Sequence, residues 1–250
     1  MGIIVKSPRE IEIMRRPGKI VSEVLDILKK RIKPGIITEE LDAITVQEFS
    51  RCGAVSSFKD YRGYPAHLCV SINDELVHGI PGKRVLKEGD IVSIDFGAFY
   101  EGFHGDAART LAVGQISALA KDLIDTTEEA LRVGIANARS GVRLGDVSSV
   151  IQSYVESRGY SVVREYAGHG IGRQLHEDPQ VPNYGSPGKG PILQKGMVLA
   201  LEPMVNAGGW RTKVGSDGWT VSTADGSLCA HFEDTIVVTD GEAEVLTRTN

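Results

Sequence analysis

Two aspartates in this sequence stand where a short hairpin would bring their carboxylates together. Asp95 lies in a run that alternates like a strand, residues 101–102 are typical of a turn, and Asp106 lies on the returning segment. Two carboxylates held this close repel each other, so either one is protonated or a divalent cation lies between them. Solvated surface acids are the usual alternative, but Ile94 and Phe96 surround the pair with apolar bulk. The pattern therefore favours a metal site.

Two glutamates have a similar place beside apolar segments. Glu202 follows the apolar run 197–201 and precedes Pro203, which discourages continuation of a central strand. Glu233 lies beside the apolar strand pattern 235–238. A buried unpaired charge is costly, so each glutamate needs an ion-pair partner or a metal. Taken alone, each glutamate is best interpreted as a structural acid in an ion pair. Together with the two aspartates, the glutamates make four such carboxylates and favour a shared cation site.

A histidine in a glycine-rich segment is the fifth candidate. His169 lies within residues 168–172, which hold three glycines, and His176 follows seven residues later. Glycines at this density predict little regular structure, and they let backbone and imidazole approach a partner closely. A lone histidine is more often a satisfied core residue, but two in one glycine-rich segment leave core and ligand roles equally open.

Two N-terminal helices are among the elements that must position these groups. Residues 7–10 form a capping box with proline at the first helical position, and apolar residues follow at helical spacing. Residues 33–35 end this helix. Thr38 is expected to cap a second helix over residues 39–50.

A similar pattern returns in the second part of the chain. Residues 34–41 align with 140–147 at an offset of 106, and residues 88–95 align with 195–202 one residue further along. Each half then reads as two helices followed by strands, with one strand in each half finishing on a carboxylate. Matches this weak also arise by chance between helix–strand units, although the paired carboxylates argue against chance.

We expect one α+β domain over residues 1–250, with antiparallel strand pairing and halves of approximately 1–110 and 111–250. Two such copies normally pack about a pseudo-twofold axis, and their shared crevice is a natural ligand site. Other site chemistries find no support, because the sequence contains no HExxH, GxSxG, GxGxxG or GxxxxGK[ST] motif.

The composition is that of an ordinary soluble protein, with 41% hydrophobic and 24% charged residues. The three cysteines lack CxxC spacing, which argues against a disulfide framework and for a reducing compartment. No apolar run approaches the ~18 residues of a membrane span. The N-terminus also shows no signal peptide, so we expect a cytoplasmic protein.

Charge is spread unevenly along the chain, whose net charge is −5. Residues 1–35 carry nine Lys and Arg against four acids. The simpler interpretation is the solvated face of a surface helix. The alternative is a basic patch that rests transiently on RNA such as a ribosome.

The site segments together closely resemble the type I methionine aminopeptidases of the pita-bread fold, and the resemblance covers essentially the whole chain. It implies a cytoplasmic, monomeric hydrolase that removes the initiator methionine of nascent polypeptides when the second residue is small. The chain lacks the zinc-binding N-terminal extension of longer eukaryotic forms and is similar to the bacterial or organellar short form. The segments are residues 73–81, Asp95 with Asp106, residues 168–172 with His176, residues 202–206, and residues 217–220 with Glu233.

The resemblance also implies a dinuclear metal site. By it, Asp95 chelates one ion, His169 and Glu202 hold the other, and Asp106 and Glu233 bridge both. A ligand set of oxygens with one imidazole suits Mn(II), Fe(II) or Co(II). Paired ions of this kind share a hydroxide that is nucleophilic near neutral pH.

Further roles come from the same resemblance. His78 and His176 are not metal ligands in the family; they stabilise the tetrahedral oxyanion and contact the scissile amide. Glu202 shuttles the proton to the leaving amine. A methionine pocket needs apolar, adaptable walls, and the candidates are Tyr64, Cys69 and Trp219, with plain core packing as the alternative for Trp219.

Two departures from the family pattern affect the pocket and a second ion. Leu175 stands where many relatives carry an aromatic residue, which predicts a methionine pocket of different shape. Cys229 stands where some relatives place a serine near an auxiliary monovalent cation, which puts that cation in doubt.

Two rival functions share the fold. An aminopeptidase P or prolidase cuts before proline, but those relatives usually carry a separate N-terminal domain for which this chain has no room. A binding protein that lost catalysis, as in some nucleic-acid-associated relatives, would lose metal ligands, and all five are present here. We expect neither DNA nor a membrane as a partner.

Overall fold

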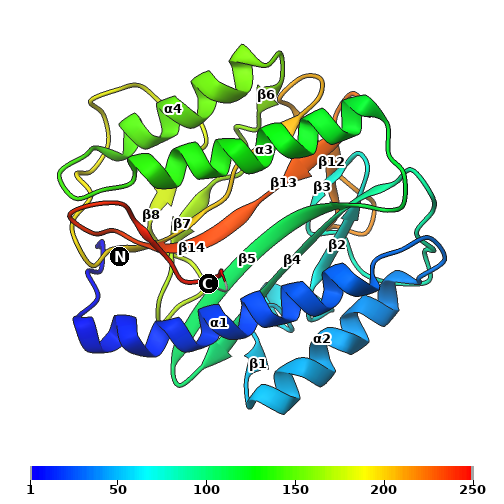
Figure 1. The fold of residues 1–250 in the computed structure, drawn as a ribbon, viewed down its shortest axis with the longest axis horizontal. Helices are drawn as coiled ribbons and strands as arrows, with labels where there is room; N and C mark the ends of the chain where they lie inside the picture. The colour runs from blue at the N-terminus through cyan, green and yellow to red at the C-terminus, as the bar shows by residue number, and fades with distance from the viewer. Residues whose placement is uncertain (1, 249–250) are drawn as a thin grey trace.

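An antiparallel sheet forms the centre of the protein in this computed structural model, which describes residues 2–248 (Figure 1). Within that range the sheet has nine strands, in the order β1-β4-β5-β14-β9-β7-β8, with β2 beside β4 and β15 beside β14. Their bounds are β1 Val55–Ser56, β2 Cys69–Ile72, β4 Ile91–Tyr100, β5 Phe103–Ala112, β7 Gly168–Gly170, β8 Glu177–Val181, β9 Val198–Leu201, β14 Glu233–Val237 and β15 Glu244–Val245.

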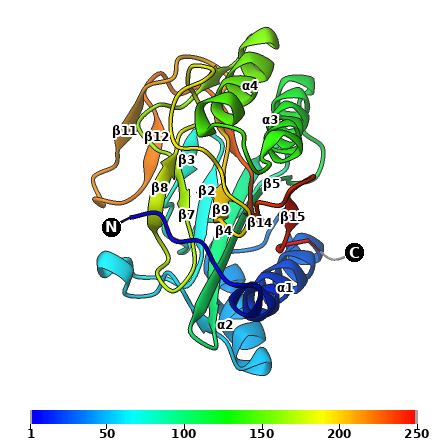
Figure 2. The ribbon, with the colours of Figure 1, turned by 90° about the vertical axis from the view of Figure 1, so that its left-hand side faces the viewer.

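Four helices cover one face of this sheet (Figures 1 and 2). The pair α1 (Pro8–Arg31) and α2 (Thr38–Cys52) packs on β4 and β5, whereas α3 (Ala118–Asn137) and α4 (Leu144–Ser157) pack on the other half. Ile94 of β4 is fully buried under the first pair. Successive side chains of a strand point to opposite faces, so the neighbouring Asp95 points to the face without helices.

The first helix is capped as predicted, and the second is not. Ser7 accepts a hydrogen bond from the Glu10 amide, and the Glu10 carboxylate accepts one from the Ser7 amide. Thr38, in contrast, is already helical, and its hydroxyl bonds the backbone of Gly82 in both directions at 2.9 Å. The prediction that Thr38 caps the helix was wrong because this long-range tie takes its hydroxyl.

Hydrogen bonds confirm the repeated pattern. Gly35 N–H donates to Leu86 O at 2.8 Å, and Gly141 N–H donates to Leu193 O at 2.9 Å, at the corresponding place in the second half. The antiparallel pair β4–β5 lies beside the pair β14–β9, so the two halves meet where β5 contacts β14. The predicted α+β architecture with two related halves is confirmed.

Two three-stranded sheets complete the structure; the first packs against α3 and α4, and the second lies on the side away from the helices (Figure 2). In the first, β10 (Met204–Asn206) pairs with β13 (Cys229–His231) and β6 (Ser161–Val162). In the second, β12 (Val221–Thr223) pairs with β11 (Thr212–Val214) and β3 (Glu75–Val77). A 3₁₀ turn over Tyr61–Gly63 completes this side.

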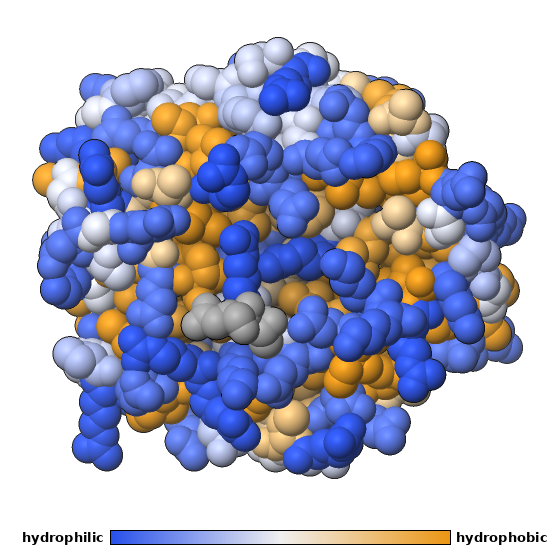
Figure 3. Space-filling model, viewed as in Figure 1, coloured by the Kyte–Doolittle hydropathy of each residue, from blue (hydrophilic) through white to orange (hydrophobic). Residues whose placement is uncertain are grey.

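The helix-covered face is largely hydrophilic, with apolar residues between the helices (Figure 3). Several basic side chains of α1 have acidic partners: Arg15 pairs with Glu12 and Glu244, and Lys19 pairs with Glu23. These pairs support the interpretation as a solvated helix face. No helix within residues 2–248 is long and apolar enough to cross a membrane.

Candidate metal centre

The strand register places three of the four predicted carboxylates on the sheet face that carries no helix, and Glu202 directly follows the neighbouring strand β9. Asp95 pairs with Ala108, and Asp106 pairs with Gly97, so the two aspartates are offset by two residues on one face. Glu233 of β14 pairs with Ala108 from the other side. The apolar run before Asp95 suggested that the strand ends at this residue. That prediction was wrong, because β4 continues beyond Asp95 to Tyr100.

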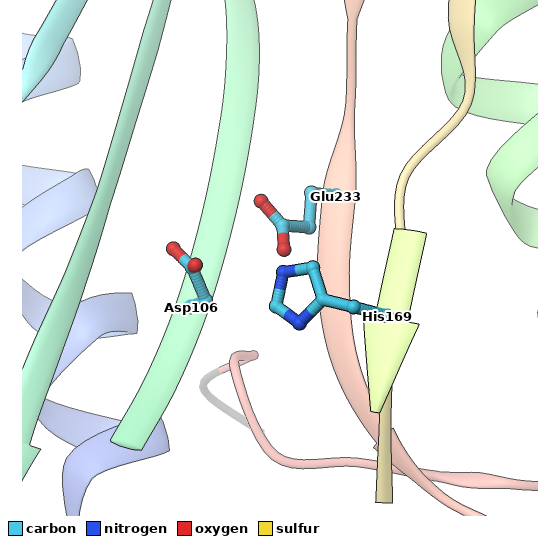
Figure 4. Close-up of side chains that lie close together, drawn as sticks. All are labelled: Asp106, His169 and Glu233. Atoms are coloured by element: carbon cyan, nitrogen blue, oxygen red, sulfur yellow. The ribbon is translucent and has the colours of Figure 1, made fainter. Parts of the chain in front are cut away.

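Three of the predicted ligands converge on one point. Asp106, His169 and Glu233 come from β5, β7 and β14 and point toward one another (Figure 4). Each offers a ligand atom, and these atoms all lie within 4.8 Å of one another. Glu202 adjoins this group, because its Oε1 lies 3.6 Å from His169 Nε2. The predicted residues therefore form one buried cluster.

The glycines around His169 serve a tight strand rather than an irregular loop. Residues 168–170 form β7, which pairs with β9 and β8, so the expectation of little regular structure was wrong. A Cβ at Gly168 would lie 2.4 Å from Ala200 O, and one at Gly170 would lie 2.2 Å from Asp178 O. Only glycine allows the neighbouring strands this close, and the pairing sets His169 opposite Ala200, on the same face as Glu202.

Burial makes the charged forms of these carboxylates costly. Burial raises the pKa of Asp106 to about 7, and burial together with Asp106 raises the pKa of Asp95 well above its ordinary value. The pKa values of Glu202 and Glu233 are raised well above theirs, first by burial and then by the neighbouring carboxylates. A cation among them would reverse this penalty.

The donor set fits a divalent ion. Buried oxygens of Asp95, Asp106 and Glu233 have no hydrogen-bond partner within residues 2–248. Nδ1 of His169 lies 2.9 Å from Gly170 O, which leaves the lone pair of Nε2 for a ligand. Burial lowers the pKa of His169 to about 4, so the imidazole is neutral as ligation requires. The residues present therefore suit hard or borderline divalent cations.

A cavity of about 520 Å³ opens beside the cluster and includes its four carboxylates and His169 in its lining. Tyr64, Cys69 and Trp219 line it as well. The Trp219 ring stands edge-on to Tyr64 with centroids 5.2 Å apart and stays partly exposed, so it both packs against the small apolar cluster around Tyr64 and lines the cavity. Apolar and aromatic walls of this kind fit an unbranched apolar side chain.

The two further predicted histidines also border the cavity. The ring of His176 lies 4.1 Å from that of His169, and its Nδ1 lies 2.8 Å from the Tyr61 hydroxyl. Burial lowers the pKa of His176 to about 3. Burial also lowers the pKa of His78, whose backbone has a φ of 61°, a left-handed conformation that costs energy outside glycine.

The two departures from the family pattern have clear positions. Leu175 is buried and lines the cavity. The Cys229 thiol donates to Asn73 O at 3.3 Å, so the side chain at this position supplies no oxygen ligand to a cation. All three cysteines are free, as expected from their number.

His231 is a cavity residue that the sequence patterns did not single out. Its side chain is 2% exposed, and its Nε2 lies 3.6 Å from Glu202 Oε2. The signal was its position two residues before Glu233, which places both side chains on the same side of an extended segment.

Comparisons with known proteins agree with one another. A model described as metallopeptidase family M24 matches residues 12–240. The chain is 56% identical over 246 residues to methionine aminopeptidase 1 of Bacillus subtilis, covering 98% of this chain and 99% of that one. The crystal structure of methionine aminopeptidase from Thermotoga maritima superposes with a TM-score of 0.98 at 50% identity, covering 99% of this chain and 100% of that one.

More distant neighbours include proteins named as Xaa-Pro dipeptidases or prolidases. The Xaa-Pro dipeptidase from Bacillus anthracis has a TM-score of 0.79 and 26% identity. The match covers 98% of this chain and 62% of that protein, which is therefore considerably longer.

Proposed function

Because the chain belongs to metallopeptidase family M24 and has its pita-bread fold, we propose that it hydrolytically removes N-terminal methionine from polypeptides whose second residue is small. The observation that carries the proposal is the convergence of Asp106, His169 and Glu233 beside an apolar cavity. Curated relatives at 45–56% identity over nearly the whole chain are named methionine aminopeptidases.

We assign the five clustered residues to two divalent ions. Asp95 would hold one ion, His169 and Glu202 would hold the other, and Asp106 and Glu233 would serve both. The partnerless carboxylate oxygens and the raised carboxylate pKa values support this assignment. The oxygen-rich ligand set favours Mn(II), Fe(II) or Co(II). Such a pair supplies a water of lowered pKa and polarises the scissile carbonyl.

The chain's own residues bind the substrate and move the proton. Tyr61 O–H can donate to His176 Nδ1, which sets the proton of the neutral ring on Nε2 as a hydrogen-bond donor. That N–H stabilises the developing oxyanion, while His78 contacts the scissile amide. Glu202 accepts the proton of the attacking water and passes it to the leaving amine. Tyr64, Cys69 and Trp219 enclose the methionine side chain.

The rival readings receive less support. The proline-directed neighbour is considerably longer than this chain. A non-catalytic role is disfavoured because all five assigned ligands are present. We further propose a single catalytic domain over residues 1–250 that acts as a cytoplasmic monomer on nascent chains, and we treat transient ribosome contact through α1 as part of the same proposal.

Three peptides test the function. The enzyme, stripped of metal and reloaded with Mn(II), is incubated with Met-Ala-Ser, Met-Leu-Ser and Ala-Pro-Ser, and free amino acids are quantified. Release of methionine from Met-Ala-Ser alone supports the proposal. Cleavage of Ala-Pro-Ser instead would assign a proline-directed function, and silence with every peptide in a metal-loaded protein would favour a binding role.

A further inference from the structure

His231 places an imidazole in the cavity without any bonded partner for its ring. The side chain is 2% exposed, and neither ring nitrogen has a hydrogen-bond partner within residues 2–248. A neutral imidazole always carries one N–H donor, and burying that donor unsatisfied is costly. The orientation of this side chain therefore needs an explanation, and its nearest acceptor provides one.

The acceptor is the carboxylate of Glu202, which lies between two imidazoles. Oε1 of Glu202 is 3.6 Å from His169 Nε2, and Oε2 is 3.6 Å from His231 Nε2. One oxygen thus faces His169, a proposed metal ligand, and the other faces His231. Carboxylates that ligate metals are themselves held by hydrogen bonds from a surrounding layer of residues.

The backbone of His231 is fixed by the central sheet. Its N–H donates to Thr110 Oγ1 at 2.8 Å, and its carbonyl accepts from the same hydroxyl at 2.9 Å. Thr110 also shares a hydrogen bond of 2.8 Å with Ser93 on the neighbouring strand β4. The position of the imidazole is consequently tied to β4 and β5, which also carry Asp95 and Asp106.

We propose that His231 is a positioning residue, whose Nε2–H donates to Glu202 Oε2 and so turns Oε1 toward the metal side. The inference rests on the proposed function, because it concerns Glu202 as ligand and proton carrier. An approach of about 0.6 Å brings the pair to the ~3.0 Å of an N–H···O hydrogen bond. Hydrogen bonds to an ionised carboxylate are short and strong, so ionised Glu202 favours that approach.

Two substitutions separate hydrogen bonding from packing. His231→Gln keeps an N–H donor in a side chain of similar size, and His231→Met keeps the size but removes the donor. His67→Met is the matched control, because His67 does not line the cavity. The measurements are Mn(II) binding to the stripped proteins by calorimetry, the thermal midpoint, and kcat and KM on Met-Ala-Ser.

We expect His231→Met to bind one Mn(II) about 10–100-fold more weakly and to lose kcat while KM changes little. His231→Gln should bind and turn over close to the wild type, and all variants should unfold at similar temperatures. Wild-type binding and turnover in His231→Met would overturn the proposal. Equal losses of Mn(II) affinity and kcat in the Gln and Met variants would also overturn it. If both variants lost a whole equivalent of metal, His231 would be a ligand rather than a positioning residue.

The binding experiment also keeps the two proposals apart. If the wild type releases no methionine, but the Met variant still binds Mn(II) more weakly than the Gln variant, then the proposed function fails and the positioning role stands. If the wild type is active and the two variants equal it in binding and turnover, then only the positioning role fails.

Discussion

His169 Nε2 and Glu202 Oε1 lie 3.6 Å apart where β7 pairs with the end of β9. Divalent ions bind imidazole nitrogen and carboxylate oxygen at about 2.0–2.2 Å, so a single ion fits between the two atoms. The pair comes from the second half of the chain, whereas Asp95 and Asp106 come from the first. The proposed centre therefore joins the two halves of the sheet.

Removal of Glu202 tests the proposed ligand set. Glu202→Ala should lose one of two bound ions and abolish turnover, because it removes both a ligand and the proton carrier. Metal content after dialysis, measured by mass spectrometry, and methionine release check the two effects. Normal activity in this variant would refute the site assignment. Glu165→Ala, at the cavity mouth, is the control for loss of a carboxylate.

Removal of His78 tests the distinction between ligand and substrate contact. His78→Ala should retain both ions while kcat falls by about 10²–10³, because the contact to the scissile amide is lost; this is the order of loss found when one transition-state hydrogen-bond donor is removed from an enzyme. Loss of an ion in this variant would instead make His78 a ligand. The same metal analysis and a kcat measurement at saturating peptide distinguish these cases.

The buried carboxylates predict how the metal-free protein responds to pH. A carboxylate whose pKa is raised on folding binds more protons in the native state, so stability falls as pH rises between its unfolded and folded pKa values. For Asp106 this window runs from about 4 to about 7. Folding lowers the pKa of His169 to about 4, so this residue has the opposite effect. Its contribution makes stability rise with pH from about 4 to the unfolded pKa near 6.5.

Below pH 6.5 the carboxylates and His169 have opposite effects on stability. Above pH 6.5 only the destabilising effect of the carboxylates continues. The thermal midpoint of the stripped protein should therefore fall between pH 6.5 and 8. Mn(II) should remove this fall, because the ions take the place of the protons. Thermal scans at several pH values, with a chelator and with excess Mn(II), compare the two states. A thermal midpoint that rises with pH in the chelator-treated protein would contradict this electrostatic explanation.

The glycines of β7 predict a local packing effect. Gly168→Ala places a methyl group 2.4 Å from Ala200 O, so β7 and β9 must separate. We expect a destabilisation of about 1–3 kcal/mol, as for other overpacked interiors, together with weaker metal binding through His169. Gly82→Ala is the control, because nothing lies within 4 Å of the added carbon. Chemical denaturation of both variants measures the difference, and equal stabilities would contradict the packing argument.

Local sequence patterns were sufficient to predict several structural elements. The alternation around Asp95, the turn at residues 101–102 and the cap at Ser7 depend on neighbours in sequence, and each appears as expected. The repeat also predicted that the two halves share a layout, because its residues are equivalent at a fixed offset. These features follow from short-range propensity and periodicity.

Long-range contacts explain what local patterns did not supply. Thr38 looked like a cap, yet its hydroxyl bonds Gly82, which is 44 residues away. The segment at residues 168–170 looked irregular, because glycine disfavours strands in isolation, but close pairing with β9 requires glycine there. The approach of His231 to Glu202 depends on a contact between β13 and the end of β9 that no sequence spacing encodes.

The most direct test of the account is methionine release from Met-Ala-Ser by chelator-stripped enzyme as Mn(II) is added back. We expect no release from protein whose metal content is verified to be nil, and recovery of turnover as the clustered carboxylates and His169 bind Mn(II). Turnover by the metal-free protein at the rate of the reloaded enzyme would contradict a metal-dependent aminopeptidase. Failure of the reloaded enzyme to release methionine would contradict the proposed reaction itself.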